Sequence, residues 1–247
     1  MTWLHAVIDV PRDQLRPAAE FWGGLTGWPA GAPWPGHREL RSLEPPDGSA
    51  YLHLQEVDGG PRVHLDLESE APDATVAQAR DLGASLVAAR DRWQTLASPG
   101  GLPFCVLAAA DRRAPQPVGW PGGHTGRVVQ VCVDSPPELH ETEVAFWRAL
   151  LPGRWVDSPA PEFAGKWHAD GSPLQLLFQR LDEADGPVRA HVDHGADDVP
   201  AEVRRVRGLG AADLGAGPGW HVLRDPAGMV FCVTANRPEG VEDRDLG

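Results

Sequence analysis

A long internal repeat constrains the fold of this chain more than any other feature. The segment Arg62–Leu67 (RVHLDL) returns as Arg189–His194 (RAHVDH), so that His191 is the counterpart of His64. The same offset separates three further pairs of segments: Leu82-Gly83-Ala84 from Leu209-Gly210-Ala211, Trp93 from Trp220, and Phe104-Cys105-Val106 from Phe231-Cys232-Val233. A repeat of this length is the size of a domain and far longer than a solenoid repeat.

We therefore predict two related domains, over residues 1–110 and 127–247, joined by a linker over residues 111–126. The linker is rich in proline, glycine and arginine, and we expect it to pack loosely on the surface. Within each domain the apolar periodicity predicts a strand, a helix and further strands, twice over. The predicted fold is α+β, with two βαβββ modules in each domain. We expect a curved sheet with helices on one face and a cup on the other; the periodicity supports the modules, and the curvature does not follow from it.

Composition narrows the class of protein. The 247 residues carry a formal net charge of −13, which argues against nucleic acid as a partner. No apolar run approaches the length of a membrane span, and no signal pattern opens the chain. The three cysteines, Cys105, Cys132 and Cys232, do not form the framework of a secreted protein. We expect a cytoplasmic protein, either a monomer that forms an internal pseudo-dimer or a homodimer.

The repeated strand carries polar residues on one face. Side chains alternate along a strand, so His64 and Asp66 share a face, as do His191 and Asp193 in the second copy. A histidine with a carboxylate two residues on can bind a metal or act as a base. The alternative interpretation is a hydrogen-bonded polar pair that lines the sheet.

The chain resembles the vicinal oxygen chelate superfamily, which includes glyoxalase I, bleomycin-resistance proteins and extradiol dioxygenases. It is similar to actinobacterial glyoxalase-like tandem proteins. The resemblance covers nearly the whole chain. The segments that carry it are His5-Ala-Val-Ile-Asp9, Phe21-Trp22, Gly27-Trp28, Val63-His64-Leu65-Asp66-Leu67, Leu82-Gly83-Ala84, Asp225-Pro226-Ala227-Gly228 and Phe231-Cys232-Val233.

The resemblance implies a set of metal-ligand positions in each domain, and we expect each set to converge on one cavity. The positions are His5, Gln55, His64 and Cys105 in the first domain and Gln130, Gln179, His191 and Cys232 in the second. The metal enzymes of the superfamily carry glutamate where both copies here carry cysteine. The second set has one imidazole, so we expect it to be degenerate. The sequence requires no cofactor, and a divalent ion (zinc, nickel, manganese or iron) is what the resemblance implies.

Other residues are candidates for binding an organic ligand. They are Tyr51, His53, Asp66, Trp93, Cys132, Asp193 and Trp220. Tyr51 and His53 share a strand face with Gln55, and the two tryptophans fall in hairpin strands. Tryptophan often lines pockets for flat molecules. The alternative is that the histidines line the cup without meeting one ion and that the cysteines are small buried apolar residues.

Three functions are compatible with these residues. The first is a protein that binds a small hydrophobic or cationic organic molecule in a cup, for resistance or sequestration. The second is a metal-dependent lyase, isomerase or dioxygenase that works in the first cup, where His5 and His64 hold the ion and Asp66 orients a ligand. The third is a structural or partner-binding module.

Overall fold

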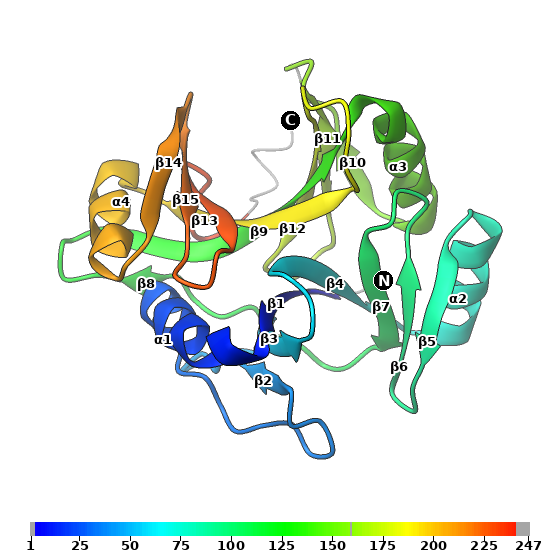
Figure 1. Ribbon diagram of the computed structural model, residues 1–247, viewed down its shortest axis with the longest axis horizontal. Helices are drawn as coiled ribbons and strands as arrows, with labels where there is room; N and C mark the ends of the chain where they lie inside the picture. Colours follow the sequence, from blue (N-terminus) through cyan, green and yellow to red (C-terminus); the bar gives the residue numbers. More distant parts are fainter. Residues whose placement is uncertain (1–2, 159, 241–247) are drawn as a thin grey trace. The chain divides into compact units, whose positions relative to one another are not determined.

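The computed structural model describes residues 3–158 and 160–240, and it confirms the α+β fold built from repeated modules (Figure 1). Module 1 comprises β1 (Trp3–Pro11), a 3-10 turn (Arg12–Gln14), α1 (Leu15–Thr26), β2 (Leu40–Ser42) and β3 (Leu52–Val57). Module 2 comprises β4 (Arg62–Ser69), α2 (Pro72–Asp81), β5 (Ser85–Ala89), β6 (Trp93–Ala97) and β7 (Pro103–Ala108).

A short strand, β8 (Val118–Gly119), precedes the second pair of modules. Module 3 comprises β9 (Thr125–Ser135), α3 (Pro137–Leu150), β10 (Arg154–Val156), β11 (Phe163–His168) and β12 (Gln175–Arg180). Module 4 comprises β13 (Arg189–Ala196), α4 (Val199–Gly208), β14 (Ala212–Gly217), β15 (Trp220–Arg224) and β16 (Val230–Thr234). None of the helices in these described residues is long and apolar enough to cross a membrane.

The strands form two curved, open sheets of mixed direction. One sheet has the order β2-β3-β1-β4-β7-β6-β5, and the other has the order β10-β11-β12-β9-β13-β16-β15-β14, with β8 on β9. In the parallel pair β4–β7, Asp66 lies opposite Cys105. In the parallel pair β13–β16, Asp193 lies opposite Cys232. Residues that are directly opposite point to the same face, so this register brings a carboxylate and a thiol together in each sheet.

The Leu-Gly-Ala repeats end two helices in the same way. Gly83 follows α2 with a φ of 104°, and Gly210 follows α4 with a φ of 106°. A side chain on either residue would be strained in this left-handed conformation, which explains why glycine ends both helices.

Packing divides the chain into two compact units, each of which draws on both repeats. The first contains the chain up to His5, His64–Arg112 and Val131–Ala190. The second contains Ala6–Val63, Arg113–Gln130 and the chain from His191. Modules 2 and 3 therefore supply most of one unit and modules 1 and 4 most of the other. The domain boundaries inferred from the sequence stay a prediction.

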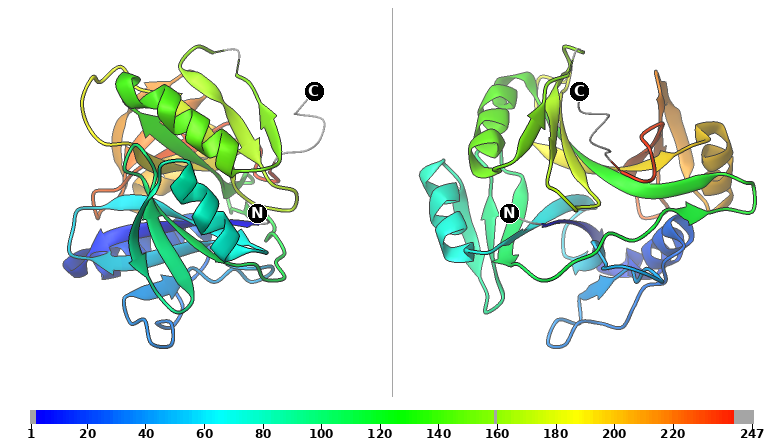
Figure 2. Two further views of the ribbon diagram at one scale, coloured as in Figure 1. Left: turned by 90° about the vertical axis from the view of Figure 1, so that its right-hand side faces the viewer. Right: turned by 180° about the vertical axis from the view of Figure 1, so that it is seen from behind.

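In the first unit, Phe104 of β7 packs its ring 5.9 Å from Phe146 and 5.1 Å from Trp147, both on α3. Helices α2 and α3 lie side by side (Figure 2). The Trp147 indole donates to Glu143 at 2.7 Å, and the other oxygen of Glu143 accepts the Gly100 amide at 2.9 Å. Burial raises the pKa of Glu143 despite these hydrogen bonds.

The second unit repeats this core with different partners. The ring of Phe231 on β16 lies 5.5 Å from the rings of Phe21 and Trp22, both on α1. The Trp22 indole donates to Asp225 at 2.8 Å, although the two residues lie near opposite ends of the sequence. Helix α1 is thus held by residues from the last module.

The linker over residues 111–126 is mostly exposed or half-buried, but hydrogen bonds fix parts of it and of the residues just before it. Within the first unit, the amide of Ala110 and the guanidinium of Arg112 both donate to the buried Glu68. Within the second unit, the Arg113 amide donates to Ser49, and β8 pairs with β9. The Pro- and Gly-rich composition prevents long regular elements here, but it does not prevent the backbone from being fixed by buried side chains.

Candidate metal centres

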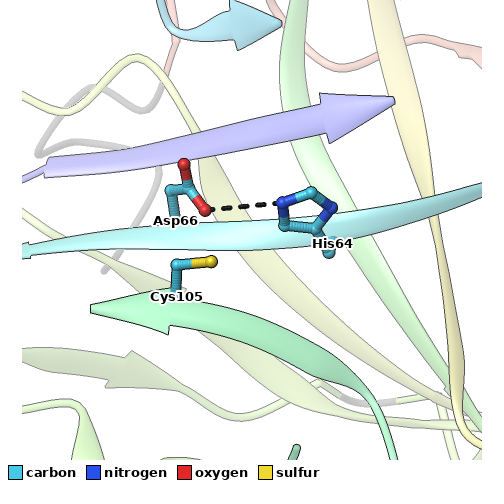
Figure 3. A group of neighbouring side chains, drawn as sticks. All are labelled: His64, Asp66 and Cys105. Atoms are coloured by element: carbon cyan, nitrogen blue, oxygen red, sulfur yellow. Dashed lines mark ion pairs between the residues drawn. The ribbon is translucent and has the colours of Figure 1, made fainter. Parts of the chain in front are cut away.

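The first triad consists of His64, Asp66 and Cys105, and its three ligand atoms all lie within 4.8 Å of one another (Figure 3). His64 and Asp66 project from the same face of β4, and Cys105 projects beside them from β7. The His64 Nε2 atom lies 3.6 Å from the Asp66 carboxylate. His64 and Cys105 are buried, and Asp66 is half-buried. The apolar alternation of β4 produces this arrangement, because burial of one face in the core leaves the polar residues on the other face.

The second triad consists of His191, Asp193 and Cys232, each at the position of its counterpart in the second copy of the repeat. Its ligand atoms also lie within 4.8 Å of one another. The His191 Nε2 atom lies 3.3 Å from the Asp193 carboxylate. Each triad belongs to one compact unit, the first to the first unit and the second to the second.

The donor set of each triad fits a zinc-class ion. Bonds of about 2.0–2.3 Å to nitrogen, oxygen and sulfur place the ligands of a tetrahedral zinc roughly 3.3–3.8 Å apart. The two imidazole–carboxylate distances, 3.6 Å and 3.3 Å, fall in that range. A thiolate with an imidazole favours zinc, whereas manganese and magnesium prefer oxygen-rich sets. Three protein ligands also leave a position for a further ligand, as in catalytic zinc sites.

The residue opposite each cysteine differs between the triads. In the β6–β7 ladder Thr95 lies opposite Cys105, with its hydroxyl 3.4 Å from the sulfur. In the β15–β16 ladder Val222 takes this place opposite Cys232. Trp93 and Trp220 lie two residues before Thr95 and Val222, so the strand alternation puts both tryptophans on the triad faces. Both tryptophans are half-buried.

The remaining ligand positions implied in the second domain lie in two places. In the second unit, Gln130 donates a hydrogen bond to Asp193 and so supports the second triad. In the first unit, Gln179 accepts from the Cys132 thiol at 3.7 Å, and Asp134 accepts from it at 3.5 Å. Gln179 also borders a cavity of about 530 Å³, whose lining residues are Pro161, Glu162, Gln179, Arg180, Leu181, Asp182 and Glu183.

His5 pairs with a carboxylate that the sequence interpretation missed. Its Nε2 atom lies 3.0 Å from Glu68, which is fully buried and also accepts from Arg112. Burial alone would raise the pKa of Glu68, but the hydrogen bonds from His5, Arg112 and the Ala110 amide outweigh burial and lower the pKa to about 2. The alternation along β4 was the available signal, since Glu68 continues the polar face of His64 and Asp66.

His53, Gln55 and Tyr51 all belong to the second unit. The His53 ring lies 3.0 Å from the Ser42 hydroxyl and packs edge-on against Trp34. Gln55 lies opposite Asp9 in the β1–β3 ladder and is half-buried. Tyr51 is a core residue, fully buried, with its hydroxyl donating to the Val128 carbonyl at 2.6 Å.

A second missed carboxylate, Glu202 on α4, lies in the core of the second unit. Its oxygens lie 2.8 Å from His124 and 3.0 Å from His194, and Arg205 donates to both of them. Burial opposes ionisation, yet these partners hold the pKa of Glu202 well below its usual range. Arg205 also donates to the Gly24 and Leu25 carbonyls of α1. The cluster therefore fixes α4 to α1, which is a structural role.

A protein-family model described as a glyoxalase-like domain matches residues 5–107 and again residues 130–234. No curated protein sequence matches the chain significantly. The Mn(II)-bound glyoxalase from Novosphingobium aromaticivorans is 17% identical with a TM-score of 0.68, over 93% of this chain and 80% of its own.

Two dioxygenases share the fold at similarly low sequence identity. The 2,2',3-trihydroxybiphenyl 1,2-dioxygenase from Sphingomonas wittichii strain RW1 is 14% identical with a TM-score of 0.61, over 93% of this chain and 88% of its own. The 2,3-dioxygenase LapB from Pseudomonas sp. KL28 is 12% identical with a TM-score of 0.59, over 93% and 90% of the two chains. At these identities the likeness concerns the fold alone.

Proposed function

Because the chain belongs to the glyoxalase-like domain family, we propose that it is a metal-dependent protein that binds a zinc-class ion at its His–Asp–Cys triads and holds a small organic molecule beside it. The observation that carries this proposal is the recurrence of three convergent donors at equivalent positions in both halves of the chain. Chance or a structural polar pair explains one such group more easily than two with the same donors.

The roles of the residues follow from their chemistry. His64, Asp66 and Cys105 would hold the first ion, and His191, Asp193 and Cys232 the second. A bound zinc ion would supply Lewis-acid polarisation of substrate oxygens. Zinc has no redox chemistry, so this donor set favours a lyase or isomerase over a dioxygenase. Trp93 and Trp220 offer flat apolar surfaces for the organic part of the ligand.

Metal analysis of the purified chain tests the proposal. After reconstitution with zinc and removal of excess metal, we expect two zinc ions per chain, both lost to a strong chelator. Cys105→Ser and Cys232→Ser should each lose one ion, whereas His37→Gln, a control outside the candidate metal-ligand groups, should keep two. Substoichiometric zinc that does not respond to either triad substitution would contradict the proposal.

A second candidate function is the metal-free binding of a cationic organic molecule. The cavity beside Gln179 supports it, because three carboxylates (Glu162, Asp182 and Glu183) against one guanidinium (Arg180) line this space and the whole chain carries a net charge of −13. Screening by fluorescence quenching of the tryptophans, before and after chelation, separates the two functions. Tight binding of an organic cation that survives chelation and fails in Asp182→Asn would favour sequestration.

A further inference from the structure

The two triads have the same ligands but differ in the residue that faces the sulfur. Thr95 and Val222 occupy equivalent positions in the two copies of the repeat, opposite Cys105 and Cys232. Threonine and valine have nearly the same shape, so each ladder places a side chain of the same volume beside its cysteine. What differs is one hydroxyl group, 3.4 Å from the Cys105 sulfur.

That hydroxyl acts differently on the metal-free and the metal-bound site. A metal-bound cysteine is a thiolate, and a hydrogen bond to an ionised acceptor is about twice as strong as one to a neutral acceptor. The bond from Thr95 therefore strengthens when an ion binds, which favours the bound state. Val222 offers a methyl group in its place and provides no such gain.

The hydrogen bond from Gln130 in the second triad goes to the Asp193 carboxylate and not to the cysteine sulfur. His5, the other family ligand position in the first unit, is paired with Glu68 and gives the first triad no additional ligand.

We propose that Thr95 is a positioning residue that raises the metal affinity of the first triad. This inference rests on the proposed function. Partners of metal ligands commonly change metal affinity by about 10–100-fold. We expect roughly tenfold here, at the low end, because a hydroxyl–sulfur bond is long and weak.

The test uses full-length chains in which one site has been disabled. Cys232→Ser combined with His191→Gln disables the second triad and gives the first-site chain, and Cys105→Ser disables the first triad and gives the second-site chain. Zinc affinity is measured at fixed pH by competition with a chromophoric chelator. Thr95→Val in the first-site chain should weaken binding about tenfold, Thr95→Ser should restore it, and Val222→Thr in the second-site chain should tighten it.

The controls distinguish failure of this inference from failure of the proposed function. Thr95→Val in the second-site chain should leave zinc affinity unchanged, and its circular dichroism should match that of its parent. With cobalt as the probe, Thr95→Val should shift the sulfur-to-metal charge-transfer band of the first-site chain only. If both single-site chains bind zinc but Thr95→Val changes affinity less than twofold, Thr95 has no such role. If neither chain binds zinc, the proposed function fails and this inference fails with it.

Discussion

The Nε2 atom of His5 lies 3.0 Å from Oε1 of Glu68, in a pair that is almost completely buried. The family resemblance implies that His5 is a metal ligand, yet its side chain is directed to a carboxylate two residues beyond Asp66 on the same strand face. Glu68 also binds Arg112, so the three residues form one hydrogen-bonded cluster. In this arrangement His5 supports the fold of the first unit beside the first triad.

This geometry predicts that His5 and His64 differ in their effect on metal binding. His5→Gln should keep the zinc stoichiometry of the parent, since glutamine can still donate to Glu68. His64→Gln should lose one ion, because the first triad loses its imidazole. Metal content after gel filtration measures both. Loss of one ion from the His5 variant with retention in the His64 variant would restore His5 to the ligand set.

Glu68 should make stability depend on pH in a defined window. Its folded pKa is about 2, against an ordinary value of 4.5. A depressed carboxyl pKa stabilises the fold fully above pH 4.5, and this contribution is lost as the pH falls toward 2. Glu68→Gln should therefore lower the free energy of unfolding by about 2–3 kcal/mol at pH 7. The difference from the parent should shrink steadily between pH 4.5 and 2.

Urea denaturation at several pH values measures this difference. The matched control is Glu70→Gln, which removes an exposed carboxyl group two residues away on the same chain segment. It should change the free energy of unfolding by less than about 0.5 kcal/mol at any pH. A Glu68→Gln penalty that stays constant from pH 7 to pH 2 would show that the lost stability does not come from the ionised carboxylate.

The sequence repeat and strand alternation were sufficient to predict the fold and one part of the site. Alternation along Arg62–Leu67 placed His64 and Asp66 on one face, and the register of β4 with β7 adds Cys105. The ligand positions that the family resemblance implies include His64 and Cys105. They do not indicate that Asp66 lies beside both. The prediction of ligands depends on which strands pair and in which register, and a local pattern does not contain that information.

The roles of His5 and Glu202 could not be predicted for a different reason. Each depends on a contact between segments that are distant in the sequence: His5 with Glu68, and Glu202 with His124. A glutamate on a helix or strand is most often solvent-exposed, so the sequence alone favours that assignment. Only the packing of the compact units shows that both carboxylates are buried and paired.

Two of the buried tryptophans, Trp22 and Trp147, provide a matched pair of stability tests. Trp22→Phe removes the donor to Asp225, and Trp147→Phe removes the donor to Glu143. Each leaves a buried carboxyl group with one partner fewer, which should cost about 1–3 kcal/mol in addition to lost packing. Trp34→Phe removes a bond to Ser42 at a half-buried site and should cost less than about 1 kcal/mol. Equal losses of unfolding free energy in all three variants would show that packing, and not the hydrogen bond, determines the loss.

The last prediction concerns how the compact units are assembled from the repeats. The aromatic partners of Phe104 are Phe146 and Trp147, and those of Phe231 are Phe21 and Trp22. A cut after Arg112 would therefore divide both cores and expose large apolar surfaces on each fragment. We expect fragments 1–112 and 113–247 to lack cooperative thermal unfolding when separate, because each loses half of its aromatic packing. An equimolar mixture should regain a cooperative transition and the near-ultraviolet circular dichroism of the whole chain. A fragment that unfolds cooperatively alone, with the same midpoint before and after mixing, would show instead that each repeat is an independent domain.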